Sequence, residues 1–189
     1  MAFKPRPPEP LSPSDAPTRW AQWLALERAI ALWLHGASSV QAIVLLLMAV
    51  SWLGDGWLWY AFVVGLPFSG GDSGWRCALH MVLLGAVNLQ IYWLLKRRIA
   101  RPRPFVSCPG IRACARSLDE YSFPSGHAMH SVAYSLVLTA YFPSLAAPLW
   151  SFTALVALSR VVLGLHYPSD VVIGAAIGLF MAECSLRFI

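Results

Sequence analysis

Three short stretches of the chain combine basic, hydroxyl, imidazole and carboxylate side chains, the groups that bind anions and transfer protons. The first is KRRIARPRPF, residues 96–105, in which two prolines end a helix and hold the following chain extended. Arg103 offers a planar fork that matches phosphate oxygens, and Lys96 supplies a point charge. Taken alone, this stretch could equally be a basic cluster attracted to anionic lipid headgroups.

The second stretch is Pro124-Ser125-Gly126-His127, directly before an apolar run. Small residues at the start of a helix make an anion site, because unsatisfied N–H groups point outward along a favourable dipole. Ser125 adds a hydroxyl group, and His127 falls in the first turn beside any bound anion. The alternative is an ordinary helix start with an incidental histidine.

The third stretch is SRVVLGLHYPSD, residues 159–170. Arg160 ends an apolar run, where an unpaired charge costs several kcal/mol, so it needs an anionic partner. His166 and Asp170 are four residues apart, and Asp170 can accept from one imidazole nitrogen and leave the other nucleophilic. An interfacial His–Asp pair and a metal site are the alternatives, but the nearby arginines fit phosphate chemistry better.

The composition predicts a membrane protein. The 189 residues are 58% hydrophobic and only 12% charged, whereas roughly a quarter of the residues of a soluble domain are charged. The net charge is +5, and seven of the 14 Lys and Arg residues lie within residues 96–116. Nucleic-acid binding is the usual interpretation of such a cluster, but no soluble domain remains to present it.

The predicted fold is all-α, an integral membrane bundle of six transmembrane helices with an interfacial helix at its N-terminal end. Residues 1–18 are expected to be a Pro-rich disordered lead, residues 19–36 an interfacial amphipathic helix, and residues 37–189 the membrane domain. The turn signal Gly54-Asp55-Gly56 separates the first two spans. The expected spans are 38–53, 57–68, 75–95, 125–141, 147–165 and 170–187.

Six spans place the three stretches on one face of the membrane, although their separation in the sequence does not require it. In order, they read Lys-x6-Arg-Pro, Pro-Ser-Gly-His and Ser-Arg-x5-His-x3-Asp. This signature resembles that of the type 2 phosphatidic acid phosphatase superfamily of membrane lipid phosphatases, over roughly residues 38–187. Arg101-Pro102 does not fit the first motif, because the lysine position would then be Leu94.

The resemblance implies a role for each residue of the signature. His166 would attack phosphorus to form a phosphohistidine, Asp170 would orient it, and His127 would protonate the leaving oxygen. The phosphoryl oxygens would be held by Lys96, Arg103, Ser125, Gly126 and Arg160. No metal or other cofactor is expected, since these cations replace it. Phosphoryl transfer depends mainly on positioning and charge stabilisation, which agrees with this division of roles.

The implied function is hydrolysis of a lipid phosphate or pyrophosphate on the outer, periplasmic side of a bacterial cytoplasmic membrane. Candidate substrates are undecaprenyl pyrophosphate, phosphatidylglycerophosphate, phosphatidate and lipid A 1-phosphate, and no residue decides between them or gives the oligomeric state. The expected partners are the lipid substrate and membrane lipids, with no nucleic acid.

Phosphotransfer to another lipid is an alternative that uses the same site. A non-enzymatic lipid-binding or transport protein would be expected to lose His166 or Asp170. Vanadate-dependent haloperoxidases share the signature but are soluble.

Polar residues outside the signature are predicted to have structural or minor roles. Cys108 and Cys114 are either disulfide-bonded or free thiols. Asp55 is interpreted as a turn residue, and Asp119 as balancing the charge of its loop. His130 shares a helical face with His127 and is expected to pack, at most at the edge of the pocket.

Overall fold

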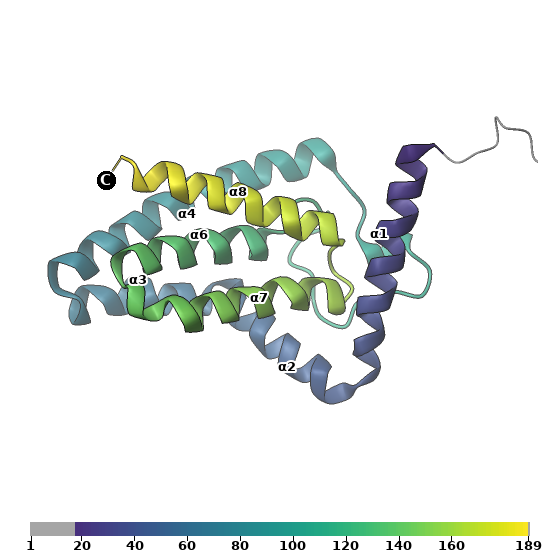
Figure 1. Ribbon diagram of the computed structural model, residues 1–189, viewed down its shortest axis with the longest axis horizontal. Helices are drawn as coiled ribbons and strands as arrows, with labels where there is room; N and C mark the ends of the chain where they lie inside the picture. The colour runs from purple at the N-terminus through teal and green to yellow at the C-terminus, as the bar shows by residue number, and fades with distance from the viewer. Residues whose placement is uncertain (1–17, 189) are drawn as a thin grey trace, which may run out of the picture.

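The computed structural model describes residues 18–188, and within that range every regular element is helical (Figure 1). The Pro-rich lead predicted for residues 1–18 lies outside the described residues apart from Thr18, whose hydroxyl caps the first helix. The α-helices are α1 (Arg19–His35), α2 (Gln41–Trp52), α3 (Leu58–Ser69), α4 (Gly71–Ile99), α5 (Pro104–Ser107), α6 (Gly126–Tyr141), α7 (Ala146–Val162) and α8 (Pro168–Leu186). Shorter turns are η2 (Gly36–Ser39), η3 (Leu53–Trp57) and η4 (Pro143–Leu145).

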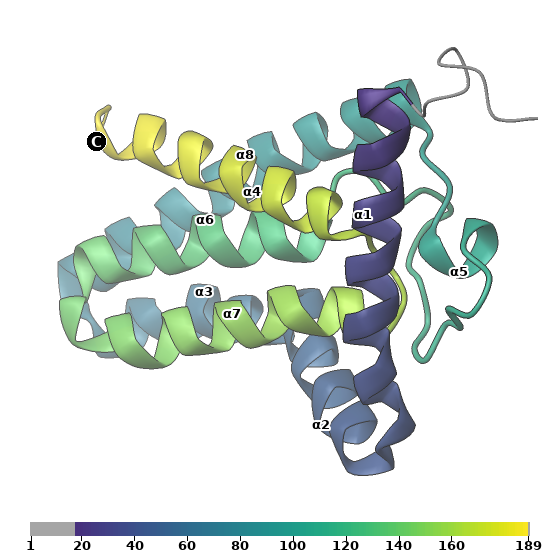
Figure 2. The ribbon, with the colours of Figure 1, turned by 45° about the vertical axis from the view of Figure 1, so that its right-hand side comes forward.

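Helices α3, α4, α6, α7 and α8 run lengthwise beside one another, and α1 crosses one end of this bundle (Figures 1 and 2). Helix α6 is central and contacts α4, α7 and α8. Because α4 and α7 run toward the end beneath α1 while α6 and α8 start there, the loops between these helices meet at that end. The arrangement brings together residues that are far apart in the sequence.

Small and hydroxyl side chains allow α6 to lie close to its neighbours. A Cβ atom built on Gly174 of α8 would lie 2.5 Å from the carbonyl oxygen of Ser125, and one on Gly178 would lie 2.1 Å from that of Met129. Gly174 and Gly178, a small-xxx-small pair, therefore form an α6–α8 contact that only glycine permits. On the side of α7, the hydroxyls of Ser135 and Thr153 form a hydrogen bond with an Oγ–Oγ1 distance of 2.7 Å.

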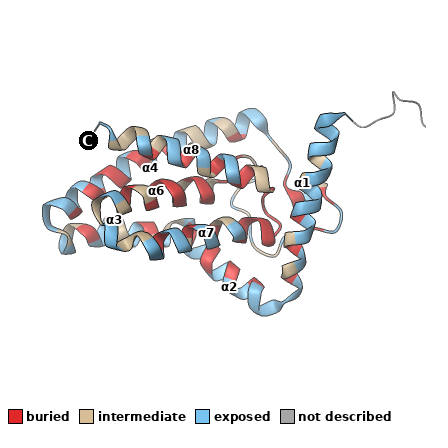
Figure 3. Ribbon diagram, viewed as in Figure 1, coloured by how far each residue is buried: buried red, intermediate tan, exposed pale blue. Residues whose placement is uncertain are grey.

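The helices of the bundle have exposed outer faces (Figure 3), and many of the residues there are apolar. Large side chains such as Val64, Phe68, Leu83 and Phe180 are more than half exposed. Exposed apolar patches of this extent indicate a membrane or interaction surface. Among the described residues, four helical stretches are long and apolar enough to cross a membrane: Gln41–Ser69, Gly71–Ser107, Pro143–Val162 and Pro168–Leu186. The prediction of an all-α integral membrane protein is confirmed.

The count of six spans is not confirmed, because the first two predicted spans form one bent helix. Helices α2 and α3 are joined through η3, and the backbone hydrogen bonds continue from Leu53 to Leu58. Only Gly56 leaves the helical conformation, with φ of 137°. A single glycine of positive φ bends a helix without ending it, so the turn signal at residues 54–56 marks a bend instead of a loop.

Helix α1 lies across the end of the bundle and exposes Trp20, Trp23 and Trp33 (Figure 2). Its inner face is anchored by Ala31, which packs with Cys108, Ile111 and Tyr167. His35 Nδ1 donates to the Val162 carbonyl oxygen at 2.8 Å. The helix is thus attached to the bundle. Its placement in the membrane interface remains a prediction.

Candidate active site

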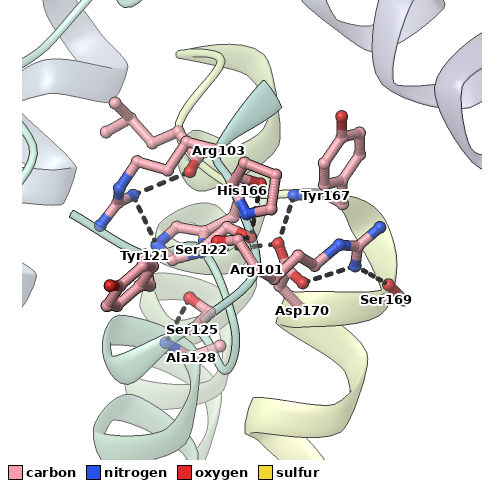
Figure 4. Close-up of polar contacts among 12 residues, drawn as sticks. Arg101, Arg103, Tyr121, Ser122, Ser125, Ala128, His166, Tyr167, Ser169 and Asp170 are labelled. Atoms are coloured by element: carbon pink, nitrogen blue, oxygen red, sulfur yellow. Dashed lines mark hydrogen bonds and ion pairs between the residues drawn. The ribbon is translucent and has the colours of Figure 1, made fainter. Parts of the chain in front are cut away.

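The three stretches converge at the end of the bundle that α1 covers (Figure 4). Helix α4 ends at Ala100, whose φ of 47° is left-handed, and Pro104 opens the short helix α5. The extended segment between them carries the arginines into the loop region. Lys96 in the last turn of α4 and Arg103 are both at most 2% exposed. Buried cations of this kind need anionic partners.

Asp119 is that partner for both cations. Its carboxylate accepts from Lys96 Nζ and, at 2.8 Å, from a terminal nitrogen of Arg103. Tyr92 Oη donates to its second oxygen. Lys96 also donates to the Tyr121 carbonyl oxygen at 2.6 Å. A protein carboxylate therefore occupies donors that the sequence assigned to a phosphate group.

Asp119 is ionised in this setting. Burial raises the pKa of its carboxyl group, but the hydrogen bonds from Lys96 and Tyr92 and the charges of Lys96 and Arg103 lower that pKa by more. The net result is a pKa below the ordinary 3.8. Asp119 was predicted only to balance the charge of its loop, and no sequence pattern linked it to the site.

The loop before α8 positions His166. Its backbone N–H donates to the Arg160 carbonyl oxygen at 3.0 Å, which fixes the histidine against the end of α7. Its Nδ1 lies 3.8 Å from Asp170 Oδ2, in the predicted pairing but too far for a hydrogen bond. Its Nε2 lies 3.3 Å from Arg103. Arginine can only donate, so Nε2 must be the acceptor nitrogen and Nδ1 carries the proton that faces Asp170.

The environment of His166 keeps its imidazole neutral. Burial lowers its pKa most, and the charges of Arg160, Arg103, Lys96 and His127 lower it further, so that it lies well below the ordinary 6.5. These are residues from all three stretches, so the same interactions show that the predicted site residues lie within electrostatic reach of one another. A neutral imidazole with an unprotonated Nε2 is a competent nucleophile at neutral pH once Arg103 turns away from that nitrogen.

Arg160 differs from the other buried cations. It is 2% exposed, and one terminal nitrogen donates to the Ser51 hydroxyl. Its Nε has no hydrogen-bond partner, and among the described residues it forms no ion pair. A buried guanidinium without a direct ion pair is costly, and an anionic ligand would lower that cost.

Ser125 and His127 lie at the start of α6. The Ser125 hydroxyl accepts from the Ala128 N–H, and its own N–H donates to the Asp170 carbonyl oxygen at 3.0 Å. That N–H is therefore engaged in joining α6 to α8. His127 Nε2 contacts Asp55 Oδ1 across the bend between α2 and α3. Asp55, interpreted from the sequence as a turn residue, is thus the carboxylate of the second histidine.

A cavity of 390 Å³ opens beside His127. Its polar end includes Asp55, Gly126 and His130, and its walls continue along the apolar faces of α3 and α4. Wall residues such as Tyr60 and Val82 are at least half exposed, so the cavity reaches the lipid-facing surface. His130 lies at the edge of this cavity, and its Nδ1 donates to the Gly126 carbonyl oxygen at 2.9 Å.

Two further features concern metal binding and the cysteines. No group of three or more His, Cys, Asp or Glu residues among the described residues is placed to hold a metal ion. From the sequence, Cys108 and Cys114 could be either disulfide-bonded or free, and in the structure both carry free thiols.

Arg101 is a site residue that the motif register excluded. Its guanidinium donates to Asp170 Oδ1 at 2.7 Å and to the Ser169 hydroxyl at 2.8 Å (Figure 4). It also donates to Glu27 of α1 at 2.6 Å. Arg101 therefore binds the carboxylate that faces the nucleophile, instead of taking the phosphate-binding position that the signature gives to Arg103.

Comparison with known proteins agrees with this architecture. A family model described as the PAP2 superfamily matches residues 74–189. The probable lipid phosphate phosphatase beta of Arabidopsis thaliana is 31% identical over 95% of this chain and 96% of that protein. The decaprenylphosphoryl-5-phosphoribose phosphatase of Mycobacterium tuberculosis is 39% identical over 45% of this chain and 46% of its own length. The crystal structure of Aquifex aeolicus LpxE superposes with a TM-score of 0.69 at 23% identity, covering 87% of this chain and 94% of that one.

The chain belongs to the PAP2 superfamily of membrane phosphatases. The family recognised from the three motifs is confirmed, and so is the prediction of an enzyme. The roles of the individual residues remain predictions that the geometry above supports.

Proposed function

We propose that this protein removes the phosphate group of a lipid phosphate or pyrophosphate through a phosphohistidine formed on His166. The observation that carries the proposal is Arg160, a buried cation without an anionic partner, next to an imidazole whose Nε2 is unprotonated. The lipid-facing cavity begins on the other side of the site, at His127. A phosphate group attached to a lipid fits both features.

The reaction has two steps. His166 Nε2 forms a bond to phosphorus while the bond from phosphorus to the lipid oxygen breaks, and His127 gives its proton to that oxygen. Water then attacks the phosphohistidine and loses a proton to His127, which releases inorganic phosphate and restores His166. Asp170 stabilises the imidazolium that develops on His166, and Arg103 can turn from Nε2 to a phosphoryl oxygen. Chemistry of this kind relies on positioned charges more than on new bonds to the protein.

The cavity would take the start of the lipid chain. It links the proposed proton donor to the membrane, so the leaving group can remain in lipid while its phosphate meets the buried cations. The relatives described above are named as phosphatases of lipid phosphates and of a decaprenylphosphoryl sugar phosphate. We propose a polyprenyl pyrophosphate or a glycerophospholipid phosphate as the substrate class.

The proposed location is the cytoplasmic membrane of a bacterium, with the site facing the periplasm. Exposed positions at the two ends of the bundle can test the orientation. In a background without native cysteines, Arg116→Cys at the site end should react with an impermeant maleimide on intact spheroplasts, and Ser69→Cys at the opposite end should not. The reverse pattern would place the site on the cytoplasmic side.

The deciding experiment is a phosphate-release panel with the purified protein in lipid nanodiscs. The panel comprises undecaprenyl pyrophosphate, phosphatidylglycerophosphate, phosphatidate and lipid A 1-phosphate, each with chelator and without. Release in chelator together with an acid-labile, base-stable phosphoprotein would support the proposed chemistry. Absence of release from every lipid by well-folded protein would refute the proposed function, and activity lost in chelator and restored by a metal ion would refute the mechanism.

A further inference from the structure

The N-terminal helix reaches the proposed catalytic machinery through one side chain, that of Glu27. Its Oε2 accepts from Arg101 at 2.6 Å, and its Oε1 accepts from the backbone N–H of Ser169 at 3.1 Å and from the Ser169 hydroxyl. No other acidic residue lies on α1. Glu27 therefore contacts both Arg101 and the first turn of α8, two positions directly beside Asp170.

Arg101 lies between two carboxylates. One terminal nitrogen donates to Asp170 Oδ1 and the other to Glu27 Oε2, while the guanidinium stacks over the Tyr167 ring with its carbon 4.2 Å from the ring centre. A planar fork held at both ends and stacked on a ring has a single orientation. Asp170 is fully buried, so its position depends on the few donors that reach it.

Asp170 in turn faces the proposed nucleophile. Its Oδ2 accepts from the Tyr167 backbone N–H at 2.8 Å and lies 3.8 Å from His166 Nδ1. A small closing movement would turn this approach into a hydrogen bond, as often happens when a substrate binds. The direction of that carboxylate is set by Tyr167 on one oxygen and by Arg101 on the other, and the Ser122 side chain also reaches it.

We propose that Glu27 and Arg101 are positioning residues that hold Asp170 in line with His166, so that α1 is part of the catalytic apparatus. The inference rests on the proposed function for its kinetic consequences, and on the contacts alone for its structural ones. Glu27 acts through Arg101, and Arg101 acts through Asp170. The substrate touches neither residue.

A purely structural role for Glu27, fastening α1 to α8 through Ser169, makes a different prediction. In that case its loss would loosen the helix, and the stability of the protein would change while the turnover of folded enzyme stayed the same. Ser169→Ala removes the fastening hydroxyl, which also accepts from Arg101, but it leaves Arg101 bound to both carboxylates. A positioning role therefore predicts a smaller loss of kcat in Ser169→Ala than in Glu27→Gln, so the two roles are separable in the intact protein.

The test compares Glu27→Gln, Glu27→Asp, Arg101→Lys and the double variant Glu27→Gln/Arg101→Lys in full-length protein. Glu27→Gln should lower kcat about tenfold, the usual effect of losing a group that orients a reacting residue. Its KM should change by less than about twofold, because no contact to substrate is lost. Glu27→Asp should recover part of the activity.

The kcat of the double variant should be only slightly lower than that of Arg101→Lys alone, since Arg101→Lys already breaks the same chain of contacts. Glu183→Gln, the same change on exposed α8 surface at the far end, is the matched control and should leave kcat unchanged.

A second readout does not depend on turnover. In ¹⁵N-histidine-labelled protein, the signal of His166, assigned by its loss in His166→Gln, should show the Nδ1–H tautomer in both wild type and Glu27→Gln, because Arg103 donates to Nε2 in both. The chemical shift of Nδ1, which depends on how close Asp170 lies, should differ between the two proteins. An unchanged kcat or an unchanged Nδ1 shift in Glu27→Gln overturns the inference, as does an equal loss of kcat in Ser169→Ala. If wild type hydrolyses no lipid phosphate, the proposed function fails, and the comparison of Nδ1 shifts still decides the positioning role.

Discussion

The buried cations of the site fall into two groups that differ in how their charges are compensated. The first half of the site consists of cations paired with carboxylates: Lys96 and Arg103 with Asp119, and Arg101 with Asp170. The second half consists of Arg160, which forms no direct ion pair and donates to the Ser51 hydroxyl, and the cavity beside His127. The charge of Arg160 acts on both histidines. The protein supplies the anionic partners of the first half, whereas Arg160 is left to pair with a ligand.

This difference separates two tasks that a hydrolytic site must perform. A nucleophile benefits from rigid neighbours, because misplacement by about 1 Å can cost on the order of 10²-fold in rate. A ligand benefits from a charge that its own binding compensates. Near α8, the carboxylates hold the neighbours of the nucleophile in place. Near α7 and the α2–α3 bend, Arg160 supplies a charge that a ligand can compensate.

Removing the nucleophile should break the first half most completely. His166→Ala should lower phosphate release by more than about 10⁴-fold, because no other group can form the covalent intermediate. Phosphate release from lipid in nanodiscs measures this, with size-exclusion chromatography to show that the variant is folded. Activity within tenfold of wild type would assign the nucleophile elsewhere.

Replacing cations from each half should lower activity similarly and change stability in opposite directions. Arg160→Met and Arg103→Met should each cost roughly 10²–10³-fold in kcat/KM. Arg160→Met should raise the thermal unfolding midpoint of ligand-free protein, because it removes an uncompensated buried charge. Arg103→Met should destabilise by about 3 kcal/mol, because it breaks a buried ion pair.

Differential scanning fluorimetry without phosphate distinguishes these variants. A lower midpoint in Arg160→Met would mean that the protein itself compensates the Arg160 charge, and the contrast between the halves would fail.

Asp119→Asn should make Lys96 and Arg103 more available to a phosphate ligand. The carboxylate competes with phosphate for Lys96 and Arg103, so removing its charge should tighten binding of inorganic phosphate about tenfold. Competitive inhibition of lipid hydrolysis by phosphate measures the change, and Glu120→Gln, an exposed neighbour, is the matched control. Weaker inhibition would show that Asp119 instead arranges the two cations for the ligand.

Filling the cavity should affect only substrates that use it. Ala86 lines the cavity on α4, and Ala86→Trp should raise KM for a long-chain lipid phosphate about tenfold through lost space for the chain. Hydrolysis of p-nitrophenyl phosphate should change little. Leu83→Trp, on the exposed face of the same helix, is the control. An equal effect on both substrates would remove the cavity from the path of the lipid.

The smallest effect concerns pH. The pKa of His166 is lowered by burial and by the arginines, so the imidazole should stay neutral, and therefore nucleophilic, as the pH falls below 6.5. The acid limb of kcat/KM should thus lie below pH 6.5 and should move upward in Arg160→Met. An acid limb above 6.5 would contradict the environment described for this residue.

Much of the site could be predicted because its central residues fall in three dense motifs. Helix boundaries set by prolines and glycine placed Lys96, Ser125 and His166 at one end of the bundle, and the structure brings them together. The carboxylates that complete the site follow no such rule. Glu27, Asp55 and Asp119 come from a separate helix, a bend and a loop, and only the folded arrangement shows which cations or histidines they meet.

The bend between α2 and α3 escaped prediction for a related reason. A Gly-Asp-Gly triplet in an apolar run is compatible with a loop or with a kinked helix, and the choice depends on what packs against it. Here Gly54 lies against α7, where an added Cβ would be 3.0 Å from the Val156 side chain. Arg101 was excluded by the spacing of one motif, and its place beside Asp170 reflects the path of the chain after α4.

Helix α6 is shorter than the helices that surround it. It has 16 residues, so at a rise of about 1.5 Å per residue it extends about 24 Å, whereas the hydrocarbon core of a bilayer is about 30 Å thick. The neighbouring stretches Gly71–Ser107, Pro143–Val162 and Pro168–Leu186 are long enough to cross that core. The shorter central helix leaves room at the end of the bundle for the loops that carry the buried cations. A lipid phosphate that enters from the bilayer would then meet these cations below the level of the headgroups.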